Sequence, residues 1–339
     1  MKDFLLRPIC EVAPGDDGAS LVRWPINFKR IETISLDRAP RRLPLKTFSP
    51  ELLRNFTSEK APVLGVPMDY PRIMGILNVT PDSFSDGGQH SAVDEAVARG
   101  LEMAREGADF IDIGGESTRP GAEVVSLAQE QDRVLPVIEG LIAGGLKAPI
   151  SIDTRNAGTA RAAFAAGARL WNDVSALTHD PAAIETAVDL DATVCLMHAQ
   201  GDPSHMQENP SYRNVLIEIN AYLEARVEAC VAAGLSREKL IVDPGIGFGK
   251  TLEHNVELLS GLSAFHGIGC PVLLGVSRKR FIGVLGEEPE AANRAPGSIA
   301  AAIVGVQQGS QIIRVHDVKE TRQAVAVWAV ATGFWDSEQ

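Results

Sequence analysis

The chain reads Met74-Gly-Ile-Leu-Asn78-Val-Thr80-Pro81-Asp82-Ser83-Phe84-Ser85-Asp86-Gly87-Gly88, a short apolar strand that runs into a loop of turn-forming and oxygen-bearing side chains. Seven more strand-like runs follow, and nearly all end in a polar cluster. They lie at residues 111–115, 150–152, 170–171, 194–197, 241–242, 272–276 and 312–313. Polar groups that follow successive parallel strands collect at one edge of a sheet, so the pattern predicts one shared site.

Helical patterns alternate with these strands. Apolar residues recur at three- and four-residue spacings in 94–106, 127–142, 159–166, 215–233, 256–265, 299–306 and 318–331. Parallel strands need crossover helices, and a sheet covered on both faces needs them on its outer side. The sequence therefore predicts an α/β fold, a (β/α)8 TIM barrel with its active site where strands run into the following helices.

These segments resemble dihydropteroate synthase, a family of pterin-binding enzymes. Two signatures carry the resemblance: Ile76-Leu-Asn-Val-Thr-Pro-Asp-Ser-Phe-Ser-Asp-Gly-Gly88 and Gly107-Ala-Asp-Phe-Ile-Asp-Ile-Gly-Gly-Glu-Ser-Thr-Arg-Pro-Gly121. The resemblance runs in order from about residue 72 to the C-terminus. It implies a transferase of folate biosynthesis that joins (7,8-dihydropterin-6-yl)methyl diphosphate to 4-aminobenzoate, giving 7,8-dihydropteroate and diphosphate.

Composition narrows the class of protein. With 339 residues, 45% of them hydrophobic, the chain can bury a full barrel core. A net charge of −12 argues against nucleic acid as a partner. There is no membrane-spanning apolar run, the first residues are too soon interrupted for a signal peptide, and the four cysteines lack paired spacing. We therefore expect a cytoplasmic protein.

The basic residues near strand ends are informative in so acidic a chain. Such a group predicts a cationic mouth that focuses an anionic ligand, although each residue alone also fits a solvated rim. The group comprises Arg119, Lys250, Arg278, Lys279, Arg280, Arg314 and His316.

The dihydropterin ring offers adjacent N–H donors beside a carbonyl acceptor, and a carboxylate takes two such donors side by side. Asp243 is the predicted acceptor, Asp153 and Asn172 complete the polar edge, and Lys279 donates to the ring. The competing interpretation is that these charges only neutralise one another inside the barrel. The resemblance implies the same four residues for pterin binding, with Met197 and Phe248 packing on the ring, where plain core packing is the alternative.

The diphosphate needs donors and a cation. Arg314 and His316 alternate on the last strand and so face the same way, which suits phosphate oxygens. The resemblance makes Asn78 the ligand of Mg²⁺, which usually takes few protein oxygens besides substrate phosphates. We expect Thr118 and Arg119 to add diphosphate contacts, and Lys279, Arg314 and His316 to be the catalytic residues.

The loops after the first two strands are rich in glycine and small polar residues, as in mobile lids. The resemblance places 4-aminobenzoate there, with Thr118 and Pro120 as contacts, Phe84 on the first loop and Ser277 opposite. For Pro120 a purely structural turn is the alternative.

Other functions stay open at this point. A related pterin-binding methyltransferase domain would share acidic pterin recognition without Arg314 and His316, and a non-catalytic pterin-binding barrel could dispense with leaving-group residues. The stretch Gly245-Ile-Gly-Phe-Gly-Lys250-Thr251 lacks the four-residue gap of a phosphate-binding P-loop.

Residues 1–70 lie outside the resemblance. They contain strand-like stretches near 20–28 and 30–36, a proline- and arginine-rich linker at 40–44 and a helix start at Ser49. We expect a small N-terminal extension packed on a barrel of residues 71–339. The resemblance suggests a homodimer, for which the apolar residues of 299–306 and 325–330 offer a face.

Overall fold

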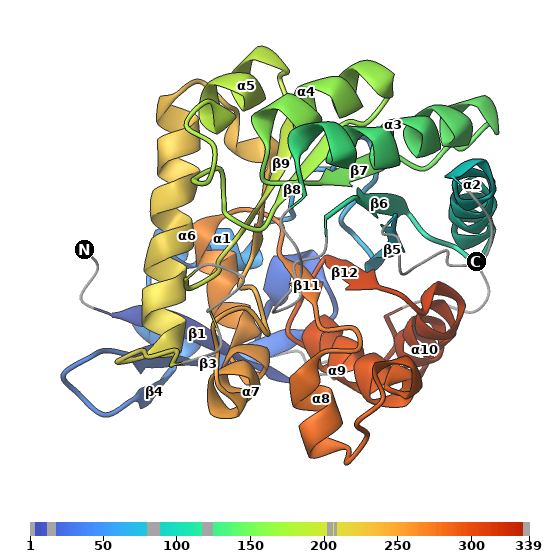
Figure 1. Cartoon of the computed structure of the whole chain (residues 1–339). Helices are drawn as coiled ribbons and strands as arrows, with labels where there is room; N and C mark the ends of the chain where they lie inside the picture. Colours follow the sequence, from blue (N-terminus) through green and yellow to red (C-terminus); the bar gives the residue numbers. More distant parts are fainter. Residues whose placement is uncertain are drawn as a thin grey trace.

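The computed structural model describes residues 4–11, 18–79, 89–116, 125–201, 206 and 209–334. Eight parallel strands form one sheet in the order β10-β9-β8-β7-β6-β5-β12-β11, with helices around it (Figure 1). The two ends of this order meet, because Val242 bridges to Val272 and its N–H donates to Pro271 O at 3.0 Å. The predicted (β/α)8 TIM barrel is confirmed. Its strands are β5 (Arg72–Asn78), β6 (Phe110–Gly114), β7 (Ile150–Asp153), β8 (Leu170–Asp173), β9 (Thr193–Met197), β10 (Leu240–Asp243), β11 (Leu273–Gly275) and β12 (Ile312–Val315).

A helix follows each strand, and side-chain caps fix where several of them begin. Ser126 and Gln129 form a capping box at the start of α3, Asn214 accepts from the Ile217 N–H at α6, and Thr251 caps α7. The helices are α2 (Gln89–Arg105), α3 (Leu127–Ala143), α4 (Ala157–Ala166), α5 (Ala183–Asp189), α6 (Val215–Ala232), α7 (Leu252–Ser260), α8 (Arg280–Leu285), α9 (Ala295–Gln307) and α10 (Val318–Ala331).

The barrel interior is apolar where the strands begin and polar where they end. The apolar layer comprises Met74, Phe110, Leu170, Cys195, Ile241, Leu273 and Ile312, all buried. Side chains two positions further along a strand share its inward face. On that face lie Asp112 after Phe110, Asn172 after Leu170, Asp243 after Ile241 and Arg314 after Ile312. The strand register thus gathers the polar side chains at the C-terminal mouth of the barrel.

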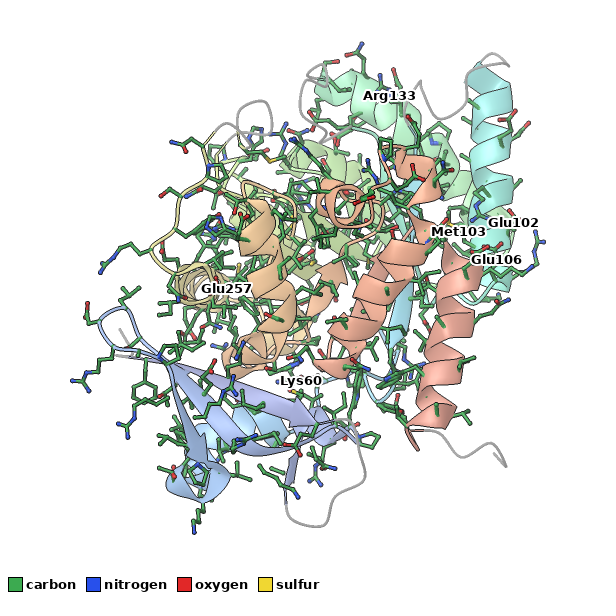
Figure 2. The ribbon with its side chains drawn as sticks, turned by 90° about the horizontal axis from the view of Figure 1, so that it is seen from below. Lys60, Glu102, Met103, Glu106, Arg133 and Glu257 are labelled. Atoms are coloured by element: carbon green, nitrogen blue, oxygen red, sulfur yellow. The ribbon has the colours of Figure 1, made fainter. Side chains whose placement is uncertain are left out.

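The N-terminal segment covers the opposite end of the barrel. It forms a small antiparallel sheet of β1 (Leu5–Glu11), β2 (Ala19–Ser20), β3 (Asn27–Ile34) and β4 (Arg41–Pro44), followed by helix α1 (Pro50–Thr57). Val63 and Met68 belong to the buried apolar layer at the strand starts. In Figure 2 Lys60 lies between this sheet and the barrel. Its ammonium donates to Asn55 O at 2.7 Å and His266 O at 3.4 Å, so it ties α1 to the barrel.

Several sequence predictions need correction. Residues 40–44 are not simply a linker, because 41–44 form β4 and pair with β3. The predicted helix at 256–265 is the end of α7 followed by the 3-10 helix η5 (Leu262–Ile268). Helices α5 and α8 were not predicted, since seven and six residues are too few for a clear helical period. The start at Ser49 is correct, and its Oγ accepts from the Leu52 N–H.

Candidate active site

Two carboxylates share one guanidinium at the mouth of the barrel. Arg314 Nε donates to Asp112 Oδ2 at 2.6 Å, and Arg314 Nη2 donates to Asp153 Oδ2 at 2.7 Å. Asn172 Nδ2 also donates to Asp112 Oδ2, at 3.1 Å. Strands β6, β7, β8 and β12 are thereby joined through side chains that all end near one point.

The charge balance of this group sets the protonation of Asp153. Burial raises the pKa of Asp153 to about 7, against the opposing effect of Arg314 and with the help of the neighbouring Asp112 charge. Burial lowers the pKa of Arg314, but the negative charges of Asp112 and Asp153 raise it by more, so the net shift is upward. Asp153 therefore holds a proton more strongly than an exposed aspartate does.

Asp243 ends β10 and is held by the turn that follows. The Gly245 N–H donates to Asp243 Oδ1 at 2.7 Å. Burial raises the pKa of Asp243 to about 6, although this hydrogen bond and the nearby Lys279 lower it. A Cβ at residue 275 would lie 3.7 Å from Asp243 Oδ2, an ordinary contact distance. A carboxylate can accept about four hydrogen bonds, so Asp243 keeps acceptor capacity for a ligand beyond the bond from Gly245.

Lys279 stands beside Asp243 and over an aromatic ring. Its Nζ lies 3.8 Å from the centre of the Phe248 ring, a cation–π contact. Burial lowers the pKa of Lys279 to about 7, while Asp243 raises it. A Cβ at residue 247 would lie 2.8 Å from Lys279 Cδ, so Gly247 lets the lysine stem pass the loop.

The remaining predicted residues of the described part line the same end. Ser277 Oγ lies 2.9 Å from His316 Nδ1 and accepts from the His316 backbone N–H at 3.2 Å. Asn78 ends β5, and its Oδ1 would lie 3.8 Å from a Cβ at Gly114. Met197 ends β9 and is buried. Among the described residues no three His, Cys, Asp or Glu side chains come close enough to hold a metal ion by themselves.

This arrangement combines hydrogen-bond acceptors, two cations and a hydroxyl–imidazole pair at one end of the barrel. The model of the pterin-binding enzyme family matches residues 74–316, most of the chain and all of the strands that bear these groups. The chain belongs to this family.

Individual members of the family are similar over nearly their whole length. The chain is 48% identical to the dihydropteroate synthase of Escherichia coli over 77% of this chain and 91% of that protein. A Xanthomonas albilineans dihydropteroate synthase solved with 4-aminobenzoic acid is 46% identical, with a TM-score of 0.75 over 80% of this chain and 97% of that one. The same enzyme solved with 7,8-dihydropteroate is 44% identical, with a TM-score of 0.72 over 78% and 95%. The resemblance seen in the sequence is confirmed.

Within this pterin-binding barrel, the structure brings together seven of the predicted side chains at the mouth. These are Asp153, Asn172, Asp243, Lys279, Arg314, Phe248 and Met197. Ser277 and His316 form a pair beside them. Phe84, Thr118, Arg119 and Pro120 lie outside the described residues. The ligand roles of all these residues stay predictions, as does the cytoplasmic location; no described helix is long and apolar enough to cross a membrane.

The cationic mouth is smaller than the sequence predicts. Lys250 is only 3% exposed, and its Nζ donates to Phe248 O at 2.8 Å and lies 3.1 Å from His198 Nδ1. Arg278 is paired with Asp317. Lys250 is therefore a buried loop anchor, and the sequence missed its partner His198.

Asp112 was also missed. It is fully buried, holds both Arg314 and Asn172, and its Oδ1 has no hydrogen-bond partner. Its position two residues before Gly114, on the inward face of β6, was the available signal.

Proposed function

We propose that the chain is a dihydropteroate synthase, a transferase that condenses (7,8-dihydropterin-6-yl)methyl diphosphate with 4-aminobenzoate. The products are 7,8-dihydropteroate and diphosphate. The observation that carries the proposal is the polar ring at the barrel mouth, in a fold whose solved relatives hold aminobenzoate and dihydropteroate. Both substrates are small molecules, and each has complementary groups among the residues of the mouth.

The pterin binds against Asp243, Asn172, Asp153 and Lys279. The carboxylate of Asp243 accepts from adjacent N–H groups of the ring, and protonated Lys279 donates to its carbonyl or ring nitrogen. Met197 and Phe248 pack on the ring. Because both charged groups are buried beside each other, a bound ring meets acceptor and donor at fixed positions.

In the reaction the aryl amine attacks the methylene carbon attached to the pterin. A carbon–nitrogen bond forms, the carbon–oxygen bond to diphosphate breaks with its electron pair on the leaving oxygen, and the amine loses a proton to water. An arylamine is an adequate nucleophile, so the chain contributes mainly by positioning the reactants and stabilising the leaving group. Arg314 and His316 are the groups for that second task.

Mg²⁺ fits the same end of the barrel. Asn78 offers an amide oxygen at the exit of β5, and Gly114 beside it has no side chain to cover that oxygen. An ion held by one protein oxygen and by substrate phosphates is the usual Mg²⁺ arrangement. When bound, Mg²⁺ neutralises the developing charge of the diphosphate.

The test is release of diphosphate from the purified chain, which requires both substrates and Mg²⁺. We expect turnover with both substrates, none with either alone, and loss of most turnover in Arg314→Ala with folding intact. Methyl transfer from a methylated pterin cofactor without diphosphate release would support the methyltransferase alternative. Tight pterin binding without turnover would support a non-catalytic barrel.

A second copy of the chain is the partner proposed for helices α9 and α10. Val304, Val327 and Val330 are 38%, 70% and 52% exposed on these two helices, which pack side by side. Apolar side chains grouped on one face favour a symmetric dimer. Sedimentation should give a dimer for the wild type and a monomer for Val327→Asp, while Ile142→Asp on α3 leaves the mass unchanged. A monomeric wild type would contradict this proposal.

A further inference from the structure

Arg278 has a backbone conformation that its side chain disfavours. Its φ is +58°, in the left-handed region, where a residue with a Cβ is strained. It stands between Ser277 and Lys279, two residues of the proposed site. Strain of this kind persists only where the surroundings hold it, and it collects at functional sites.

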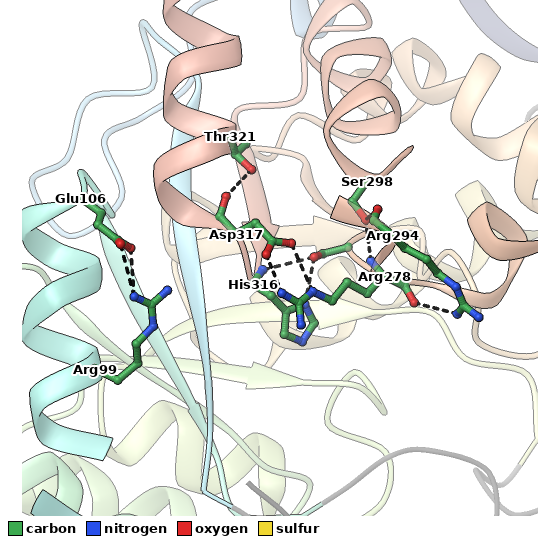
Figure 3. A network of polar contacts seen from close by, with 9 residues as sticks. Arg99, Glu106, Arg278, Arg294, Ser298, His316, Asp317 and Thr321 are labelled. Atoms are coloured by element: carbon green, nitrogen blue, oxygen red, sulfur yellow. Dashed lines mark hydrogen bonds and ion pairs between the residues drawn. The ribbon is translucent and has the colours of Figure 1, made fainter. Parts of the chain in front are cut away.

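Four contacts hold Arg278 from both sides (Figure 3). Its Nη2 and Nε donate to the two oxygens of Asp317 at 2.5 and 3.2 Å. Its backbone N–H donates to Ser298 Oγ at 2.8 Å, and its carbonyl accepts from Arg294 Nη1 at 3.2 Å. Side chain, amide and carbonyl are thus each fixed by a different residue.

These contacts join the loop after β11, which carries Ser277 and Lys279, to the loop after β12, which carries His316. Asp317 directly follows His316, and its own carbonyl accepts from Thr321 Oγ1 at 2.7 Å, which ties it to α10. Ser298 lies in α9, and its Oγ also donates to Arg294 O at 2.7 Å. The β11–α8 loop is therefore fastened to α9 through Ser298 and to the start of α10 through Asp317.

The direction of Lys279 depends on this fastening. The peptide planes on either side of residue 278 set where Ser277 and Lys279 point. If residue 278 relaxed to negative φ, Lys279 Nζ would leave its place over Phe248 and Ser277 Oγ its place beside His316. A small displacement of a positioning group costs much rate, because the reactants then miss their aligned geometry.

We propose that Arg278 and Asp317, with Ser298 and Arg294, are positioning residues that keep residue 278 left-handed and so hold Lys279 and Ser277 in the site. The proposal rests on the proposed function for its kinetic readout. Its structural part, the strained backbone held by an ion pair, is testable by pterin binding alone.

Three variants at the ion pair test the proposal. Arg278→Gly and Arg278→Ala both remove the side chain, but only glycine adopts positive φ without strain. We expect kcat/KM for the pterin diphosphate to fall at least tenfold more in Arg278→Ala than in Arg278→Gly, on the order of the losses from misplaced groups. Asp317→Asn should lower it about tenfold in the wild type and less than twofold in the Arg278→Gly background.

The dependence of kcat/KM on pH distinguishes positioning of Lys279 from a purely structural role, which would leave that dependence unchanged. If Lys279 is held less firmly, its ammonium is more exposed to water and its pKa rises. In Asp317→Asn and Arg278→Ala, the fall of kcat/KM on the alkaline side should therefore occur at a higher pH. Ser298→Ala, which removes only the bond to the Arg278 N–H, should shift it in the same direction. Thermal unfolding shows that each variant compared is folded.

Two matched controls use features outside the network. Glu106→Gln breaks the ion pair with Arg99, which Figure 3 also shows, and Glu287→Gly relieves the same left-handed strain (φ +53°) in another loop. Both should leave kcat/KM and the pH profile unchanged.

Two results would overturn the proposal and indicate a direct ligand contact. One is an equal loss of kcat/KM in Arg278→Ala and Arg278→Gly. The other is a loss from Asp317→Asn that is as large in the Arg278→Gly background as in the wild type. If the wild type releases no diphosphate, the proposed function fails instead. The same variants are then compared by calorimetric titration of a pterin without phosphates.

Discussion

Asp243 is the residue on which pterin recognition should depend most. Asp243→Asn keeps the shape but replaces one acceptor oxygen with a donor, which faces the N–H groups of the ring. We expect pterin binding to weaken by about 1–3 kcal/mol or more, since buried donors are left unpaired. Calorimetric titration with a pterin lacking phosphates measures this. Asp189→Asn, which breaks the exposed ion pair with Arg161, is the control. Wild-type affinity in Asp243→Asn would remove Asp243 from the pterin site.

Three buried groups of the site have a pKa close to neutral: Asp153, Asp243 and Lys279. In the proposed function, Asp243 and Lys279 are the two whose charge decides a hydrogen bond to the ring. Asp243 binds donors when ionised, and its pKa is raised to about 6. Lys279 donates when protonated, and its pKa is lowered to about 7. Binding of a pterin without phosphates should therefore rise with pH through about 6 and fall through about 7, as a bell with apparent values that belong to the coupled pair.

Single substitutions assign the two limbs of that bell. Asp243→Asn should abolish the acid limb and Lys279→Met the alkaline limb, each measured as affinity against pH. A profile that is flat from pH 5 to 9 in the wild type would mean that neither group changes its charge in the free protein.

The residues of the site differ in how well the sequence reveals them. Asp243 comes directly after the apolar run 241–242, and Lys279 comes three residues after the run 272–276, so their position at the mouth follows from the barrel alone. Asp112 sits inside a strand, and the partner that explains it, Arg314, is 202 positions away. Local patterns carry no information on such a pair. The two ion pairs of Arg314 with Asp112 and Asp153 were not predicted either, for the same reason, and its role toward the diphosphate stays a prediction.

At the scale of elements, the loop from Asp243 to Lys250 forms one wall of the site through close backbone packing. Gly245 has φ +67°, and a Cβ there would lie 1.9 Å from His198 O, a backbone atom that cannot rotate away. Gly245→Ala should therefore cost at least about 3 kcal/mol, from strain and overpacking together.

Urea unfolding measures that cost, with Gly145→Ala as the matched control. Gly145 has a similar φ of +80° but nothing within 4 Å of its added Cβ. It should cost only the left-handed penalty, about 1–2 kcal/mol. Equal costs at both positions would show that the packing against His198 contributes nothing.

Elements were predictable in proportion to their length and regularity. The pattern at 318–331 matches α10 and that at 127–142 nearly matches α3, because each repeats its apolar face over several turns. Strand β4 is short, exposed and contains Arg41, Arg42 and Pro44, so its only strand signal is its pairing with β3. That pairing is a tertiary contact, which sequence period does not express.

For the whole molecule, the N-terminal extension completes the barrel. The family match begins at residue 74, yet Val63 and Met68 lie in the apolar layer that closes the strand starts. Trp24 Nε1 donates to Met68 O at 2.9 Å, which links the small sheet to this layer. The end of a barrel opposite its active site contributes stability rather than chemistry. We infer that the extension stabilises the fold without taking part in the reaction.

Met68→Ala tests that separation of stability from function. Met68 is 1% exposed, so truncation leaves a cavity at the strand starts and should cost about 2–5 kcal/mol in urea unfolding. Leu52→Ala, on the exposed side of α1 at 42% exposure, should change stability by less than about 0.5 kcal/mol. At a temperature where both variants are folded, kcat/KM for both substrates should equal that of the wild type, because the cavity lies at the other end of the strands. A fall in kcat/KM without a loss of stability would instead give the extension a part in the catalytic site.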